Sequence, residues 1–233
     1  MKQEMVGNVP GNVLGMIADL AHKLQHGVIL PEEFGRFLKR EDTFGGVDVV
    51  QLVAAHQSFY RQFFGLDVDF SQVRIPESRA GFDRLIVVVQ GLTLNQIYKV
   101  CEKNFKCWRY YDNLDAVIDW DKEERNPNNG HYAIWVRDRV EADEELKNLS
   151  ANQIKERGLT TETLTERKLH GFKYWSETKE HLDRNSITLC AGSCCQGGGV
   201  PGVGWDGHYG EVSVSVYGPD GSFGNLRVRE VVS

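Results

Sequence analysis

The composition of the last part of the chain constrains its fold more than any other feature. Eleven of the 24 glycines lie at or after Gly192, and neither lysine nor arginine occurs between Asn185 and Leu226. Within this tail, defined as residues 186–233, the segment Val212-Ser-Val-Ser-Val216 alternates apolar and polar residues. Such alternation is typical of a strand with one buried and one exposed face. The tail is therefore predicted to form short strands joined by long loops.

The tail also has the composition of a contact surface. Ser213 and Ser215 should share the exposed face of the alternating strand, and Leu226, Val228 and Val231 are expected to form a last strand that returns to the sheet. The loops combine small, uncharged residues with isolated Tyr, Phe, His and Cys. This mixture is close to that of an antibody paratope, in which Ser and Gly adapt and Tyr supplies rigid contact area.

The residues before the tail predict helices and strands, and so an α+β fold. These elements are indicated by apolar residues at the helical period, by the capping pattern Thr93-Leu-Asn-Gln96 and by the β-branched run Leu85–Val89. Helices are expected over 13–26, 31–38, 47–64, 94–104, 150–157 and 161–181, and strands over 85–89 and 132–136. Cys101 is expected in the core, whereas the acids and the histidine within 161–181 are expected on a solvated face.

The overall composition is that of a globular protein. The 233 residues are 41% hydrophobic and 26% charged, which excludes disorder of the whole chain. The net charge of −6 gives no global positive field, so nucleic acid is not expected as a partner. The sequence has no apolar stretch of membrane-spanning length and no secretory signal, so a cytoplasmic location is expected as encoded. The five cysteines are expected to be reduced thiols, and no cofactor is expected.

Two motifs of the tail resemble those of a known family. Ala191-Gly192-Ser193 opens the tail region, and Asn225-Leu-Arg-Val-Arg229 closes it. They resemble the Gly-Gly-Ser and Asn-Leu-Gly-Phe-Arg segments of C-type-lectin-like domains of the formylglycine-generating-enzyme type, with departures at the third and fourth positions of the closing motif. The closer likeness within that group is to the variable proteins of diversity-generating retroelements. The resemblance implies a lectin-like domain over residues 81–233, with short antiparallel strands and two or more helices, preceded by a helical segment over residues 1–80.

The resemblance also implies how the tail is used. In the family, a reverse transcriptase rewrites the C-terminal segment at template adenines, so that a fixed scaffold displays diversified side chains to a ligand. Template codons of the asparagine type then yield Gly, Ser, Cys, Tyr, His, Phe and Asp, but not Lys, Gln, Glu, Met or Trp. The tail fits this set if Gln196, Trp205 and Glu211 are scaffold positions. The implied function is that of a binding protein without enzymatic activity, with a protein surface as its ligand.

The predicted ligand contacts lie in the loops and on the exposed strand face of the tail. Tyr209, Tyr217 and Phe223 are expected to be anchors, because aromatic residues concentrate binding energy. The full predicted set consists of Cys194, Cys195, Gly199, Gly202, Gly204, Asp206, His208, Tyr209, Ser213, Ser215, Tyr217, Gly218, Gly221, Ser222, Phe223 and Gly224.

Three thiols leave an enzymatic alternative open. Cys190, Cys194 and Cys195 lie around the opening segment, where formylglycine-generating enzymes place catalytic thiols, so the alternative function is a thiol or metal-dependent enzyme. The tail supplies no nearby cation to lower a thiol pKa, which disfavours this chemistry. A zinc site of these cysteines with His208 lacks the spacing of structural sites. The acidic run Asp119–Glu123 lacks the glycine and terminal glutamate of a calcium loop, so no metal site is predicted.

Overall fold

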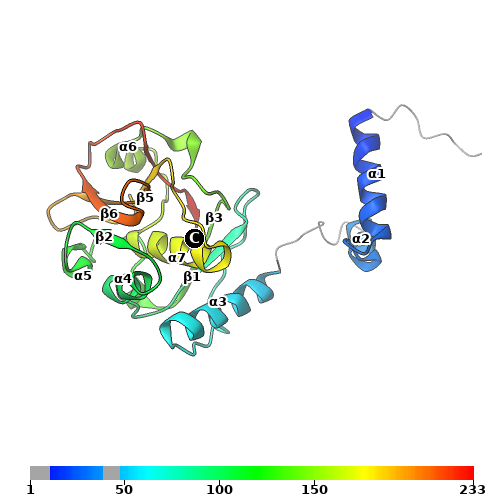
Figure 1. Ribbon diagram of the computed structural model, residues 1–233, viewed down its shortest axis with the longest axis horizontal. Helices are drawn as coiled ribbons and strands as arrows, with labels where there is room; N and C mark the ends of the chain where they lie inside the picture. Colours follow the sequence, from blue (N-terminus) through cyan, green and yellow to red (C-terminus); the bar gives the residue numbers. More distant parts are fainter. Residues whose placement is uncertain (1–10, 39–47) are drawn as a thin grey trace, which may run out of the picture. The chain divides into compact units, whose positions relative to one another are not determined.

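The chain divides into two compact units, Met1–Asp48 and Val49–Ser233. The computed structural model (Figure 1) describes residues 11–38 and 48–233. None of the described helices is long and apolar enough to cross a membrane. The predicted division near residue 80 concerned the start of a lectin-like scaffold, and it stays a prediction.

The helices follow the sequence patterns closely. They are α1 (Gly11–Gln25), α2 (Pro31–Leu38), α3 (Val49–Phe64), α4 (Leu94–Glu102), α5 (Leu114–Val117), α6 (Ala151–Glu156) and α7 (Leu164–Thr178), with short 3₁₀ helices at Pro127–Asn129 and Glu144–Leu146. The capping box predicted for α4 is present, because the Thr93 hydroxyl accepts from the Gln96 backbone and the Gln96 side chain accepts from the Thr93 backbone. Cys101 on α4 is 1% exposed, which confirms it as a core residue.

The strands form two sheets, and the described residues have a mixed α+β architecture. The three-stranded sheet has the order β1 (Arg84–Val88), β3 (Tyr132–Val136) and β8 (Val231–Val232), all antiparallel. The five-stranded sheet has the order β2 (Cys107–Arg109), β6 (Glu211–Tyr217), β5 (Val200–Asp206), β4 (Ile187–Leu189) and β7 (Leu226–Arg227). In it, β2 pairs with β6 and β7 pairs with β4 in parallel. The single last strand expected from sequence is thus two strands in different sheets.

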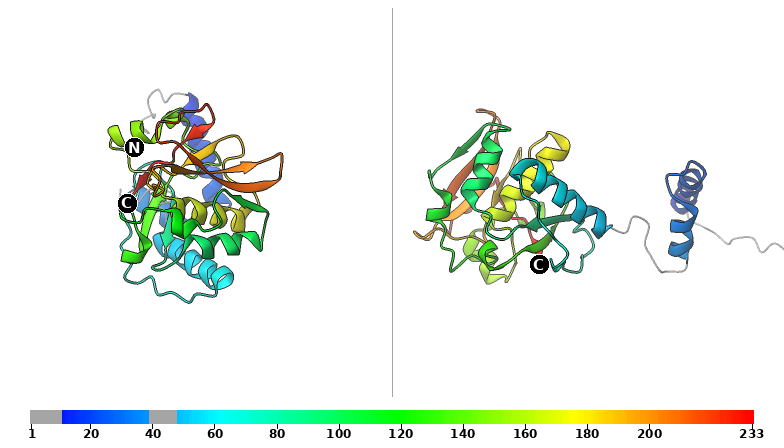
Figure 2. Two further views of the ribbon diagram at one scale, coloured as in Figure 1. Left: turned by 90° about the vertical axis from the view of Figure 1, so that its left-hand side faces the viewer. Right: turned by 90° about the horizontal axis from the view of Figure 1, so that it is seen from below.

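Helix α7 forms the centre of the second unit. It contacts β1 of one sheet and β5 of the other, and it lies between the five-stranded sheet and α3 (Figures 1 and 2). Leu169 and Phe172 of α7 are each 1% exposed. The Phe172 ring packs against Phe59 of α3, with 5.3 Å between the ring centroids. The Tyr60 hydroxyl of α3 donates to the Val87 carbonyl of β1 at 2.7 Å. These contacts join α3 to the rest of the second unit.

The charged residues around α7 contradict the expected solvated face. Glu162, Glu166 and His170 are all 0% exposed. Arg125 Nε lies 2.6 Å from Glu166 Oε1, and His170 Nδ1 lies 2.8 Å from Glu162 Oε1. Because elements pack around this part of α7, protein partners replace water at Glu166 and at one atom each of Glu162 and His170. For these three residues the prediction was wrong, because the helical period identifies polar residues but not what covers them. Glu177 and Glu180, near the end of the predicted segment, are exposed as expected.

Candidate ligand-binding face

The β5–β6 hairpin has an inner and an outer face. Val203 of β5 and Val214 of β6 are 0% and 1% exposed, and they belong to an apolar cluster with Leu94 of α4 and Leu164 of α7. Neighbouring residues of a strand point to opposite faces. The serines that flank Val214 therefore point outward, as the alternating sequence predicts.

Glycines make room for larger side chains on the outer face. Gly202 lies opposite Ser215, and Gly204 lies opposite Ser213. A Cβ atom on Gly202 would lie 2.5 Å from Cε2 of Tyr217, and one on Gly204 would lie 3.0 Å from Cγ1 of Ile187. The side chains of the tyrosine and the isoleucine thus lie over the glycines. Tyr217 is half-buried and also packs against a second apolar cluster around Leu189 and Val200.

An aromatic strand borders this outer face, and the sequence analysis did not identify it. Trp108 of β2 is in register with Ser213 of β6, and it is 43% exposed. The Tyr110 backbone N–H donates to the Val214 carbonyl at 2.9 Å, which continues the pairing. Tyr110 and Tyr111 are also exposed, and their ring centroids are 4.8 Å apart. The aromatic residues at alternate positions, Trp108 and Tyr110, were the available signal, but nothing local indicates a partner strand in the tail.

The turn between β5 and β6 presents a second group of predicted contacts. Asp206 accepts backbone hydrogen bonds from His208 and Tyr209, at 2.9 and 3.2 Å, which hold the turn. Tyr209 is 61% exposed, and its carbonyl accepts from Lys106 Nζ at 3.2 Å. Lys106 also pairs with Glu211 at 3.1 Å, so the turn is tied to the chain just before β2. An exposed tyrosine is therefore presented on a fixed turn.

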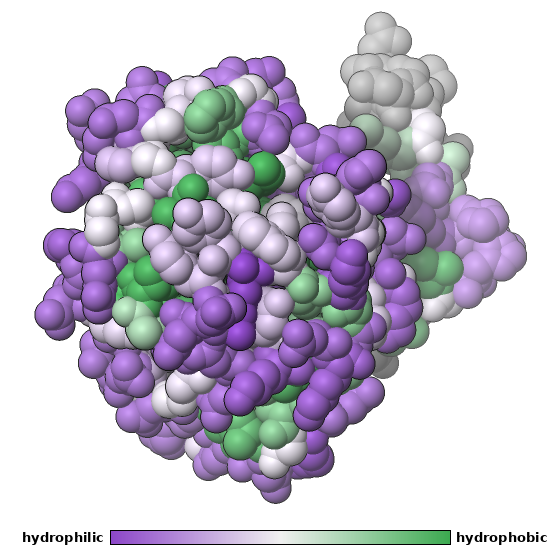
Figure 3. Space-filling view, turned by 60° about the vertical axis from the view of Figure 1, so that its left-hand side comes forward, coloured by the Kyte–Doolittle hydropathy of each residue, from purple (hydrophilic) through white to green (hydrophobic). Residues whose placement is uncertain are grey.

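The loop over residues 218–224 presents the third group of predicted ligand contacts. Phe223 is 54% exposed, and its ring centroid lies 6.2 Å from that of Tyr217. The Ser222 hydroxyl donates to the Asn148 carbonyl at 2.6 Å, and Asn152 Nδ2 donates to Asp220 Oδ1 at 2.6 Å. The loop is thus attached to the start of α6 and the residues before it. Figure 3 brings the β2–β6 side of the molecule forward, and pale residues of intermediate hydropathy occupy the middle of the view between green apolar spots.

The predicted contact residues differ in exposure. Those at the surface are His208, Tyr209, Gly218, Ser222, Phe223 and Gly224, and those that are half-buried are Cys194, Gly199, Asp206, Ser213, Ser215, Tyr217 and Gly221. Cys195, Gly202 and Gly204 are buried. Cys195 belongs to the inner apolar cluster, so it does not offer its side chain to a ligand. The two buried glycines act as spacers beneath other side chains. These three residues are corrections to the predicted set.

The thiols are mostly buried. Cys190 is 0% exposed, and burial raises the pKa of its thiol well above the usual value. Burial also raises the pKa of the Cys195 thiol to about 11. Cys194 is half-buried and lines a cavity with Lys122 and Lys155, two cations that the tail sequence could not reveal. Over residues 11–38 and 48–233, no group of three or more His, Cys, Asp or Glu side chains is placed to hold a metal ion.

The opening and closing motifs of the tail are anchored in the interior. The Ser193 hydroxyl accepts from the Leu164 backbone N–H and donates to Glu123 Oε1, both at 2.8 Å. Arg229 is 1% exposed, and its Nη2 lies 2.7 Å from Asp183 Oδ1. Arg229 also donates to the backbone carbonyls of Arg139 and Val140. The two motifs therefore hold the ends of the tail in place.

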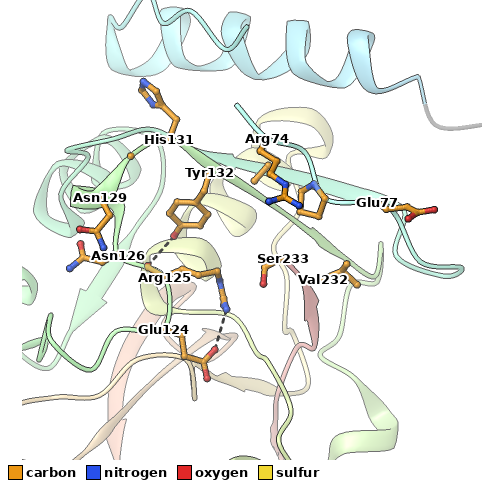
Figure 4. Close-up of a pocket in the computed structure, with 13 residues that line it drawn as sticks. Arg74, Glu77, Glu124, Arg125, Asn126, Asn129, His131, Tyr132, Val232 and Ser233 are labelled. Carbon is orange, nitrogen blue, oxygen red and sulfur yellow. Dashed lines mark hydrogen bonds and ion pairs between the residues drawn. The ribbon is translucent and has the colours of Figure 1, made fainter. Parts of the chain in front are cut away.

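Another cavity, of about 690 Å³, lies beside β3 and β8 and is separate from this face (Figure 4). Arg74 and Tyr132 point toward its centre, and the Tyr132 hydroxyl donates to the Arg125 carbonyl at 3.3 Å. The Arg125 guanidinium is already paired with Glu124 and Glu166. None of the predicted contact residues lines this cavity.

Comparisons of the chain with family models, with curated proteins and with solved structures found no match.

Proposed function

We propose that this chain is a ligand-binding protein without enzymatic activity, which displays a diversified C-terminal surface on a C-type-lectin-like scaffold. The observation that carries the proposal is the outer face of the β5–β6 hairpin. Its two central pairs, Gly202 with Ser215 and Gly204 with Ser213, are small residues, and exposed aromatic residues surround them in the turn, the 218–224 loop and β2. Small adaptable residues bordered by rigid aromatic anchors are the chemistry of a paratope, and a protein surface is the ligand that suits it.

The scaffold part of the proposal draws support from the anchoring of the tail. A surface can be diversified only if changes in it leave the core intact. The side chains of Ser193 and Arg229, in the opening and closing motifs, bond inside the second unit, whereas the predicted aromatic contacts lie outside it. The enzymatic alternative has less support, since burial raises the pKa of Cys190 and Cys195 and so disfavours the reactive thiolates.

The DNA around the gene provides the first test. A diversified protein requires a second, nearly identical copy of the codons for residues 186–233. This copy should differ from the gene mainly at adenines and should lie beside a reverse-transcriptase gene. We expect the differing codons to include those of His208, Tyr209, Ser213, Ser215 and Phe223. Those of the inner residues should be unchanged. The absence of such a copy, or differences concentrated at buried positions, would contradict the proposal.

Selection from a display library tests binding capacity directly. One library randomises the five outward positions named above, and a matched library randomises five exposed positions on α4 and α6. Both are selected against the same purified protein, hen lysozyme, which serves as an arbitrary target. We expect binders from the first library only. Equal yields from both libraries would show that the outer face has no special capacity for binding.

A further inference from the structure

A cavity of about 540 Å³ lies between α6 and the tail, near the end of the hairpin where Val200 is in register with Tyr217. It is lined by Lys122, Glu124, Ala151, Asn152, Ile154, Lys155, Leu159, Ala191, Ser193, Cys194, Gly198, Val200 and Pro219. Cys194 is the only lining residue that belongs to the predicted contact set. The volume falls in the range of small-molecule sites, which are mainly apolar and carry a few polar groups.

The floor of the cavity is apolar. Ile154 and Val200 are 2% and 4% exposed, and both belong to the apolar cluster that includes Leu189. Ala151 and Leu159 pack against the same cluster. Ser193 also lines the cavity, but its hydroxyl already has one donor and one acceptor partner within the protein. The floor therefore favours a hydrocarbon group.

The rim of the cavity carries an excess of positive charge. Lys155 is exposed and forms no ion pair with any residue over 11–38 and 48–233. Lys122 is paired with Asp119 at 2.6 Å at the protein surface. The one carboxylate of the lining, that of Glu124, is paired with Arg125 at 3.1 Å. A ligand that enters past this rim would gain from a negative charge at its outer end.

We propose that this cavity binds a small amphipathic anion, with its hydrocarbon part on the floor formed by Ile154 and Val200 and its carboxylate beside Lys155 and Lys122. A medium-length alkyl carboxylate has this chemistry. The proposal is independent of the proposed function, because neither the outward serines of the hairpin nor the predicted aromatic anchors line the cavity. It does place the ligand next to the 218–224 loop, since Asn152 N–H donates to the Pro219 carbonyl at 3.1 Å.

The test compares two amphipathic probes of similar chain length whose headgroups carry opposite charges. The full chain, labelled with ¹⁵N, is titrated with octanoate and with octylamine while its backbone amide signals are recorded by NMR. We expect octanoate to shift the signals of residues that line the cavity, such as Ile154, Ala191 and Val200. Octylamine should bind at least about fivefold more weakly, which corresponds to a charge contact of about 1 kcal/mol.

Two variants separate this site from general apolar binding. Lys155→Glu lies at an exposed position, so the fold should be retained, and it should weaken octanoate binding by about five- to tenfold. The matched control, Lys103→Glu, changes an exposed lysine that does not line the cavity and should leave octanoate binding unchanged. Equal affinity for both probes, no effect of Lys155→Glu, or shifts confined to the outer face or to the cavity of Figure 4 would overturn the proposal.

Discussion

The inner and outer sides of the tail are formed by the same strands but by different physical chemistry. The inner side holds fully buried valines and, at Thr188 of β4, a group of buried charges around Asp183. The outer side holds serines, glycines and exposed aromatic rings. Substitutions on the inner side must therefore preserve packing and charge pairing, whereas the outer side, apart from its buried glycine spacers, can change its side chains at little cost to folding. A surface that varies while its scaffold stays constant needs this separation.

The largest effect is expected when the buried charge group is broken. Asp183 is 0% exposed, and its two oxygens lie 2.7 Å from nitrogens of Arg167 and Arg229. Burial alone would raise the pKa of Asp183, but the two guanidiniums outweigh it and lower the pKa to about 2. Asp183→Asn removes the charge and leaves two buried cations unpaired. The free energy of unfolding, from urea titration, should fall by about 3–5 kcal/mol.

The matched control is Asp112→Asn, at an exposed aspartate, which should change the free energy of unfolding by less than about 0.5 kcal/mol. Equal effects of the two variants would mean that the inner side tolerates the loss of a charge as well as the surface does, and the comparison would fail.

A second buried carboxyl group should make the stability depend on pH. Burial raises the pKa of Glu123 to about 8 in the folded protein, although Ser193 donates a hydrogen bond to it. The usual value is 4.5, so between these pH values the folded state keeps a proton that the unfolded state releases. The contribution of Glu123 to the free energy of unfolding is complete below pH 4.5 and is lost as pH rises toward 8. The free energy of unfolding then falls with a slope that approaches about 1.4 kcal/mol per pH unit.

Glu123→Gln cannot titrate, and its amide oxygen can still accept from Ser193. Urea unfolding of both proteins at intervals from pH 5 to 8 isolates this group from other buried acids. The stability of the wild type should fall relative to the variant as pH rises. A constant difference across this range would show that Glu123 is ionised in the folded protein.

A moderate effect is expected where the outer face uses a glycine as a spacer. Gly202→Ala places a Cβ atom against the Tyr217 ring, which must shift, and the free energy of unfolding should fall by about 1–3 kcal/mol. Gly207→Ala is the control, because its Cβ would have an ordinary contact of 3.8 Å to the Trp205 indole nitrogen. If the clash is the cause, Gly202→Ala should cost less in a Tyr217→Ala background. If Gly202→Ala lowered the free energy of unfolding equally in that background, the loss would come from the backbone and not from the contact with the Tyr217 ring.

The sequence predicted the parts of the tail that depend on local pattern. The Val212–Val216 alternation identified β6 and its two outward serines. Outside the tail, the predicted strand Tyr132–Val136 coincides with β3. The β2 strand was missed because it pairs in parallel with β6, about 100 residues away, and no local pattern specifies such a partner. The burial of Cys195 was missed for a similar reason, since its neighbours in the core come from α4, α5 and α7.

Charge pairing in the interior was the least predictable part. Arg167, Asp183 and Arg229 are separated in the sequence, and each is of a residue type that is usually found at the protein surface. Their burial depends on all three meeting at Thr188. The same holds for Lys122 and Lys155, which bring cations next to Cys194 although the tail contains none between residues 185 and 226. Spatial neighbours from other elements set the electrostatics of the tail, and the tail sequence alone does not contain them.

The smallest effect on stability is expected at the outward serines, and this result would sharpen the comparison most. Ser213→Ala and Ser215→Ala remove half-buried hydroxyls and should each change the free energy of unfolding by less than about 0.5 kcal/mol. Val214→Ala, between them on the same strand, removes a side chain that is 1% exposed and should cost about 1.5–3 kcal/mol. Urea unfolding of the three variants compares the free energy of unfolding for substitutions on the two faces of one strand. If either serine cost as much as the valine, the outer face would be structural, and a diversified tail could not be sustained on this scaffold.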